Sequence, residues 1–187
     1  MTGSAPGDAF AETLLRCSAG LATVEPMLIR PAELTDAEAI RSIFNNEVTT
    51  STHVFELVPH TLEEQQRWIK ERSGAHAAVV AIGDGVVIGF GALSPYRPRP
   101  AYSTTVEDSV YVHPDRQGMG AGKALLSELI ELATAHGFHS MIGRIADHNA
   151  ASIALHRSLD FEEVGTEREV GRKFRRWIDV LVMQRLL

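Results

Sequence analysis

The segment Gln117-Gly118-Met119-Gly120-Ala121-Gly122-Lys123 carries the residue types that a phosphate-binding loop needs. It follows an apolar run typical of a strand, over 104–112, and precedes an amphipathic run typical of a helix, which extends to His136. Glycines let backbone amides converge on one anion, and the start of a helix adds the positive end of its dipole. The spacing therefore predicts a pyrophosphate site, with a flexible turn as the simpler alternative.

Two common phosphate loops do not match this segment. A Walker A loop requires glycine at position 117 and Ser or Thr at position 124, where this chain has Gln117 and Ala124. A Rossmann fingerprint requires its third glycine where this chain has Lys123 or Leu125, depending on the register. The loop therefore belongs to a different class of phosphate-binding proteins.

Glu107 is the candidate base, because it lies near the start of the predicted strand that leads into the glycine loop. A carboxylate in a partly apolar cleft has a raised pKa and accepts a proton directly or through water. An exposed strand carboxylate without a chemical role is the alternative. A strand amide near Tyr111 or Val112 would donate to an oxyanion if a bulge interrupts the pairing there.

Apolar periodicity and helix caps predict the elements that position these residues. Strands are expected over 27–30, 77–82, 86–93, 104–112, 141–146 and 176–187, and the last is apolar on both faces and therefore expected inside the sheet. Gly83-Asp84-Gly85 predicts a hairpin turn. Helices are expected after the capping boxes Thr35-x-x-Glu38 and Thr61-x-x-Glu64, from the end of the glycine-rich segment 118–123 to His136 with Gly137 as a left-handed cap, and over 150–159 with Asn149 as the N-cap.

Length and composition favour one globular domain. The chain has 187 residues, of which 1–26 read as a flexible N-terminal extension and 27–187 as the domain. Its formal net charge is 18 − 24 = −6, which disfavours nucleic acid as a partner. No apolar run approaches the roughly 20 residues of a membrane span, and the single cysteine, Cys17, fits a reducing compartment. The protein is therefore expected to be cytoplasmic, without a membrane partner.

The pattern Gln117-x-x-Gly120-x-Gly122 resembles the Q/R-x-x-G-x-G/A signature of the GNAT acetyltransferases, and the resemblance extends from about Leu28 to Leu187. Within that superfamily the chain is similar to the phosphinothricin acetyltransferases and their methionine-sulfone-acetylating relatives. The segments that carry this similarity are 99–102, 106–107, 110–112, Asn149, 155–156 and 171–180. The resemblance implies an α/β (α+β) domain with a mixed, mostly antiparallel sheet, helices on both faces, and splayed central strands that admit acetyl-CoA.

The resemblance also implies a function. It indicates an N-acetyltransferase that transfers acetyl from acetyl-CoA to the primary amine of a small amino-acid-like substrate, by direct transfer in a ternary complex. It implies no metal and a homodimer. The alternatives are acetylation of protein N-termini or another amine, and a CoA-binding regulatory module without catalysis.

Site residues follow from the same resemblance. Glu107 falls on the proposed base, and His156 is the candidate general acid for the leaving thiolate. The residues expected to contact acetyl-CoA are Val110, Tyr111, Val112, the loop Gln117, Gly118, Met119, Gly120, Ala121, Gly122 and Lys123, and also Asn149 and Ser158. The residues expected at the amine substrate are Phe55, Arg97, Arg99, Tyr102 and Phe174.

Two departures from the family pattern bear on this interpretation. Phosphinothricin-specific relatives carry histidine where this chain has Phe174, whereas methionine-sulfone relatives have phenylalanine, so Phe174 favours a sulfone or sulfoximine substrate. Asp160 replaces a glycine that often follows the last helix, and Asp tolerates the left-handed conformation at modest cost.

Overall fold

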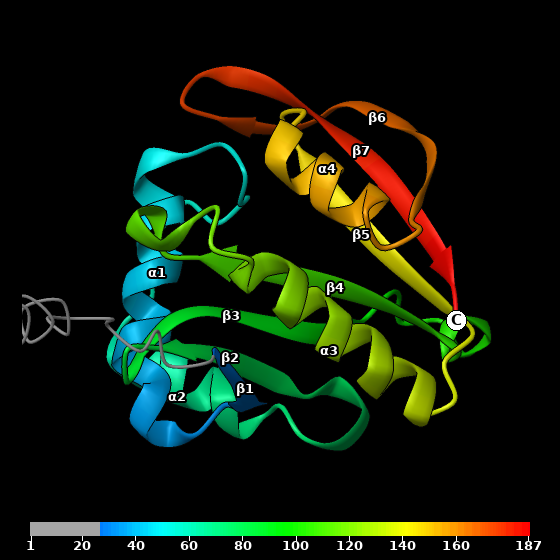
Figure 1. Cartoon of the computed structure of the whole chain (residues 1–187). Coiled ribbons are helices and arrows are strands. Elements are labelled where there is room, and N and C mark those ends of the chain that lie inside the picture. Colours follow the sequence, from blue (N-terminus) through cyan, green and yellow to red (C-terminus); the bar gives the residue numbers. More distant parts are fainter. Residues whose placement is uncertain (1–26) are drawn as a thin grey trace, which may run out of the picture.

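The computed structural model describes residues 27–187, which form one seven-stranded sheet (Figure 1). The strand order is β1-β2-β3-β4-β5-β7-β6, and all neighbours pair antiparallel except β4 and β5. The strands are β1 (Leu28–Pro31), β2 (Ala78–Gly83), β3 (Val86–Pro95), β4 (Thr105–Val112), β5 (Ser140–Ala146), β6 (Glu162–Lys173) and β7 (Arg176–Leu186). The expected mixed, mostly antiparallel sheet is confirmed. The expected extension over 1–26, with Cys17, lies outside the described residues.

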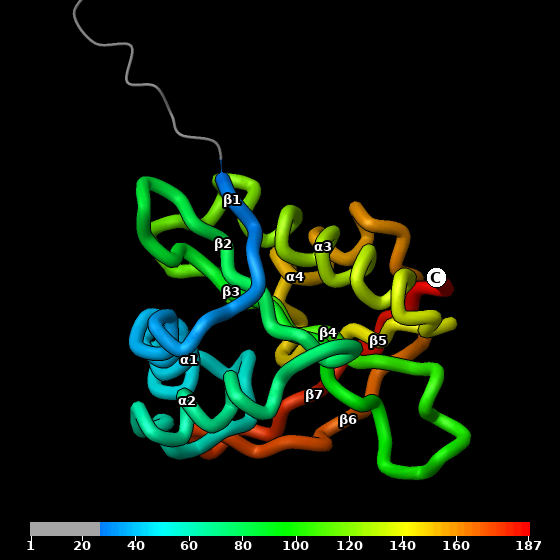
Figure 2. The backbone as a smooth tube through the Cα atoms, turned by 90° about the horizontal axis from the view of Figure 1, so that it is seen from below, coloured from blue at the N-terminus to red at the C-terminus, as the bar shows by residue number. Residues whose placement is uncertain are grey.

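Helices cover both faces of the sheet, as expected. α3 (Ala121–Ala135) and α4 (Ala150–Arg157) lie on one face, and α1 (Ala37–Thr50) and α2 (Leu62–Lys70) on the other (Figures 1 and 2). Each face has its own core, with α3 leucines on one side and α1 isoleucines against Phe90 on the other. Burial of each such side chain contributes about 1.5–3 kcal/mol. Within residues 27–187, no helix is both long enough and apolar enough to span a membrane.

Three of the four predicted caps are confirmed. Thr61 accepts from the Glu64 amide, Asn149 accepts from the Ser152 amide, and Gly137 adopts φ +78° after α3. The prediction of a capping box at Thr35-x-x-Glu38 is wrong. The Asp36 carboxylate binds the Arg30 guanidinium at 2.7 Å and accepts from the Glu33 amide at 2.8 Å, so a 3-10 turn forms over Leu34–Asp36 and α1 begins after it.

The strand β6 was not predicted from the sequence. It is an edge strand that pairs only with β7, and most of its residues are exposed. Polar and charged residues therefore occupy both of its faces, which removes the apolar alternation that marks a half-buried strand. β7 lies between β5 and β6, as its two apolar faces predicted, and Asp160 adopts the expected left-handed conformation with φ +62°.

The sheet opens between its two parallel strands. β4 and β5 pair from Thr105↔Ser140 to Asp108↔Gly143 and no further. β4 continues along β3 to Val112, while β5 continues along β7 to Ala146. The two strands diverge beyond the Asp108↔Gly143 pair, as Figure 1 shows, and we call this pair the vertex of the split.

Candidate active site

A cavity of about 700 Å³ occupies the split between β4 and β5. Residues from both faces of the sheet line it. On the face of α3 and α4 it is lined by the glycine loop, the start of α3 and residues of α4, and on the other face by the segment after α1. The cavity therefore has two parts. One is a candidate phosphate site beside the glycine loop, and the other, which we call the second compartment, lies beside the segment after α1.

The glycine loop supplies an anion site at the start of α3. Gly120 is the N-cap with φ +87°, Gly118 has φ +76°, and a Cβ on either would meet no atom within 4 Å. The first amides of a helix lack intrahelical acceptors, so those of α3 are available to a ligand. Arg116 and Lys123 also line the cavity, and one guanidinium nitrogen of Arg116 donates to Asp84 Oδ2 at 2.9 Å. Free amides, the dipole of α3 and two cations suit a pyrophosphate.

Glu107 lies in the second half of the site. Its side chain is half-buried and lines the cavity close to the vertex. Burial raises the pKa of Glu107, the positive charge of Arg144 partly opposes this shift, and the charge of Asp108 adds to it. A carboxyl group held in this way is suited to accept a proton from an amine.

His156 is almost fully buried, although its ring lines the cavity. Its Nδ1 lies 2.8 Å from the Ser152 carbonyl oxygen and its Nε2 lies 3.1 Å from Asp108 Oδ2. Burial lowers the pKa of His156, but the hydrogen bond and charge of Asp108 and the Ser152 carbonyl outweigh it, so the net shift is upward. Asp108 was not among the predicted site residues.

No bulge interrupts the β3–β4 pairing at Tyr111 and Val112. The β3–β4 register continues without a shift from Val106 to Val112. Amides of β4 that face β5 are freed instead by the split, which leaves Ser109 to Val112 without a partner on that side. Val110, Tyr111 and Val112 line the cavity. The amides on this free edge of β4 can therefore donate to an oxyanion without a bulge.

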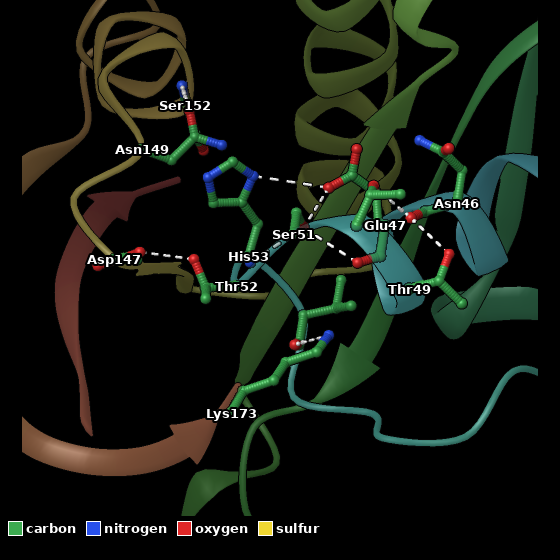
Figure 3. Close-up of polar contacts among 12 residues, drawn as sticks. Asn46, Glu47, Thr49, Ser51, Thr52, His53, Asp147, Asn149, Ser152 and Lys173 are labelled. Carbon is green, nitrogen blue, oxygen red and sulfur yellow. Dashed lines mark hydrogen bonds and ion pairs between the residues drawn. The ribbon is translucent and has the colours of Figure 1, made fainter. Parts of the chain in front are cut away.

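The segment after α1 lines the second compartment and forms the wall described here. Figure 3 shows the polar contacts that hold this segment. Glu47 Oε2 accepts from Ser51 Oγ at 2.6 Å and lies 3.5 Å from His53 Nδ1. Lys173 Nζ, which comes from the β6–β7 hairpin, donates to the Val54 carbonyl at 2.9 Å. These contacts fix the wall on both sides of the cavity.

Phe55 belongs to this wall and lines the cavity. Its ring packs on Gly171 of β6, where an added Cβ would lie 2.4 Å from the ring. Thr52 Oγ1 donates to Asp147 Oδ2 at 2.5 Å, which ties the same segment to the loop after β5. The position of the Phe55 ring is therefore set by residues distant in the sequence.

Several predicted site residues lie outside the cavity lining. Arg97 stacks near Tyr96 and Tyr102, with its guanidinium carbon 4.8 Å and 5.6 Å from their ring centres, although its charge still reaches Glu107. Ser158 Oγ donates to the Leu155 carbonyl, and Phe174 is 54% exposed in the β6–β7 turn. The predicted residues that do not line the cavity are Arg97, Arg99, Tyr102, Met119, Ser158 and Phe174.

Most of the predicted site residues are brought together by the fold. The predicted residues that line the cavity are Phe55, Glu107, Val110, Tyr111, Val112, Gln117, Gly118, Gly120, Ala121, Gly122, Lys123, Asn149 and His156. Sequence reasoning missed Asp108, Arg144 and the Glu47–Ser51–His53 group. A signal existed for Asp108, because two adjacent acidic residues are unusual in an otherwise apolar strand.

Comparison with known proteins agrees with this geometry. The model of the Acetyltransferase (GNAT) family matches residues 38–161. An L-methionine sulfoximine/L-methionine sulfone acetyltransferase from Pseudomonas paraeruginosa is 40% identical over 158 residues, covering 83% of this chain and 92% of that enzyme. The chain belongs to the GNAT acetyltransferase family and is an N-acetyltransferase enzyme.

Solved structures resemble the whole domain. A phosphinothricin acetyltransferase from Sinorhizobium meliloti, in complex with AcCoA, has a TM-score of 0.83 at 39% identity, covering 86% of this chain and 88% of that one. A ribosomal-protein-alanine N-acetyltransferase from Brucella melitensis has a TM-score of 0.83 at 40% identity, covering 86% and 99%. These relatives differ in the amine that their names give, so the substrate of this chain requires a separate argument.

Proposed function

We propose that this enzyme transfers acetyl from acetyl-CoA directly to the primary amine of a small amino-acid-like molecule of the methionine sulfone, methionine sulfoximine or phosphinothricin type. The observation that carries the proposal is the split at the Asp108↔Gly143 pair. It joins an anion site at α3 to a compartment that contains a carboxyl group of raised pKa.

The residues present fit acetyl-CoA. The amides at Gly118 to Gly122, with Arg116 and Lys123, would hold the pyrophosphate, and the free edge of β4 would hold the pantetheine arm. Acetyl-CoA, when bound, supplies the acetyl group as a thioester. Glu107 removes a proton from the ammonium, so that the amine becomes a nucleophile. A freed amide of β4 stabilises the negative charge that develops on the carbonyl oxygen.

A CoA-release assay tests the substrate. Methionine sulfone, methionine sulfoximine, phosphinothricin and a peptide with N-terminal alanine are compared at the same enzyme concentration. We expect kcat/KM to be highest for one of the three small amino-acid analogues, because the Phe55 ring, packed on Gly171, lines the second compartment and limits the room beside it. Preference for the peptide would support acetylation of protein N-termini, and no CoA release with any amine would favour a non-catalytic module.

Direct transfer predicts sequential kinetics. The only cysteine, Cys17, lies outside the described residues and far in sequence from the cavity, so no acetyl-cysteine intermediate is expected. Initial rates with both substrates varied should give intersecting lines in double-reciprocal plots, and Cys17→Ala should keep wild-type kcat. Parallel lines, or an acetylated enzyme seen by mass spectrometry, would contradict direct transfer.

Phe55→Ala should weaken binding of the amine. Removal of the ring takes away about 1.5 kcal/mol of apolar contact, which corresponds to a rise in KM for the amine of roughly 10-fold, with KM for acetyl-CoA unchanged. Phe174→Ala is the matched control, because Phe174 is a similarly exposed phenylalanine that does not line the cavity. Equal effects of both changes would place the amine elsewhere.

A further inference from the structure

The helix α4 forms one side of the cavity, close to the glycine loop. Its residues Ser152 and Leu155 line the cavity, as does Gly122 of the loop. The Leu155 Cδ2 atom lies 3.3 Å from the point where a Cβ on Gly122 would stand, so the helix approaches the loop closely. The position of α4 therefore sets the width of the space beside the anion site.

Little apolar burial holds this helix on the sheet. α4 has eight residues, which are too few for a helix to be stable by itself. Within Ala150–Arg157 a single residue, His156, is buried, while Ile153 and Leu155 are partly buried against the core. A surface helix is usually fixed by a stripe of buried apolar side chains. In α4, the contacts of one polar side chain must supply much of that attachment.

His156 joins α4 to β4 at the vertex of the split. Its Nε2 lies 3.1 Å from Asp108 Oδ2, and the two side chains are 5% and 2% exposed. Its Nδ1 lies 2.8 Å from the Ser152 carbonyl oxygen. Gly143, the β5 partner of Asp108, leaves room for the ring, because a Cβ there would lie 2.7 Å from Cδ2 and Nε2. The ring is thus enclosed by β4, β5 and its own helix.

Both of these contacts require an N–H group of the ring. A carbonyl oxygen and a carboxylate only accept, so Nδ1 donates to Ser152 and Nε2 donates to Asp108, and only the protonated ring can do both. Oδ1 of Asp108 is buried and has no hydrogen-bond partner among the described residues. Loss of the Nε2 proton would therefore leave a buried carboxylate without a donor from residues 27–187. Since both N–H groups are engaged within the protein, the ring is suited to anchor the helix.

Asp108 is the one ionisable group, among the described residues, whose charge acts on the ring. The other elements packed on the ring present Gly143 from β5 and Phe161 from the segment after α4, with 4.9 Å between the ring centres. Burial lowers the pKa of His156, but the hydrogen bond and charge of Asp108 and the Ser152 carbonyl outweigh it, so the pKa is raised. The contact is therefore intact at neutral pH and is lost as the pH rises through this raised pKa.

We propose that the contact between Asp108 and His156 is a clamp that holds α4 at the distance from the glycine loop at which acetyl-CoA fits. When the contact is broken, α4 is no longer held at that distance and the affinity for acetyl-CoA falls. Both are positioning residues and act separately from Glu107, whose side chain points to the opposite face of the sheet because it is adjacent to Asp108 on one strand. The inference rests on the proposed use of acetyl-CoA and is independent of which amine is acetylated.

The first test is the pH dependence of acetyl-CoA affinity in the wild-type protein. Calorimetry from pH 6.5 to 9 should show a loss of about 10-fold, the effect of one charge-assisted hydrogen bond. Its midpoint should coincide with the titration of the His156 ring, followed by nitrogen-15 NMR and assigned by comparison with His156→Gln. Binding that does not change with pH, or that changes at another midpoint, would refute the clamp alone. A wild-type protein that does not bind acetyl-CoA would refute the proposed function as well.

Two substitutions of Asp108 separate the clamp from a general loss of stability. An Asn amide can donate to Nε2 of a neutral ring, which still donates from Nδ1 to Ser152. Asp108→Asn should therefore keep nearly the neutral-pH affinity of the wild type up to pH 9. Asp108→Ala removes the contact and should weaken acetyl-CoA binding by about 10-fold at every pH. An Asn variant with the alkaline loss of the wild type, or an Ala variant with full affinity, would contradict the proposal.

Gly143→Ala displaces the ring without changing either partner, because its Cβ would lie 2.7 Å from ring atoms. It should also weaken binding by about 10-fold. Asp36→Ala is the matched control, since Asp36 is similarly buried and ion-paired, to Arg30, but does not line the cavity. It should lower thermal stability, as Asp108→Ala does, and keep both the affinity and the pH dependence of the wild type. An equal loss of affinity in this control would show general destabilisation in place of a clamp.

Discussion

Replacement of Glu107 by Gln is expected to lower turnover by on the order of 10²-fold or more, because the variant keeps the shape of the side chain but cannot accept a proton. Burial is the main cause of the raised pKa of Glu107, so the wild-type rate should rise with pH as this carboxyl group ionises. The Gln variant should lose that acidic limb. Its affinity for acetyl-CoA should stay nearly unchanged, because the anion site lies at the start of α3.

The measurement is kcat between pH 5 and 9, with acetyl-CoA affinity measured by calorimetry. Glu131→Gln is the control, since Glu131 is an exposed residue of α3 that does not line the cavity. It makes the same chemical change and should leave both quantities as in the wild type. Full activity of Glu107→Gln across the pH range would mean that another group, or water alone, accepts the proton.

Local signals in the sequence were sufficient for most of the fold. The hairpin between β2 and β3, the Thr61 and Asn149 caps and the left-handed Gly137 depend on neighbouring residues, and all were predicted. The Thr35 box failed because Asp36 has a tertiary partner, Arg30, that a local pattern does not contain. β6 was not predicted because an exposed edge strand has no buried face to produce an alternating apolar pattern.

The same distinction holds for the site. The glycine loop was recognised because its residues are contiguous and glycine adopts the positive φ found at Gly118 and Gly120 with no steric cost. The Asp108–His156 contact spans 48 positions, and it exists because β4 and β5 part at one particular pair. Spacing in the sequence carries no information on that register. The family position of Phe174 likewise did not indicate that its ring is exposed and outside the cavity lining.

Gly120→Asp is expected to abolish measurable acetyl-CoA binding while the protein stays folded. Gly120 has φ +87°, and the space above its Cα is open, so an Asp side chain fits there at about 1 kcal/mol of backbone strain. The carboxylate would then stand where the amides at the start of α3 face a phosphate group. Two unit charges of like sign about 4 Å apart repel by about 4 kcal/mol near a protein surface, which corresponds to roughly 10³-fold in affinity.

Gly137→Asp is the control that separates charge repulsion at the anion site from the effects of backbone strain and of one added negative charge. Gly137 lies at the other end of α3 with φ +78°, and a Cβ there also meets no atom within 4 Å. An acidic residue at a helix C-terminus is, if anything, less favourable, so this control should be at least as destabilised as Gly120→Asp. Calorimetry should show wild-type acetyl-CoA affinity for Gly137→Asp and none for Gly120→Asp, with both proteins giving cooperative thermal unfolding. Equal affinity in the two variants would show that the glycine loop does not bind the pyrophosphate. The assignment of this face of the cavity to acetyl-CoA would then be wrong.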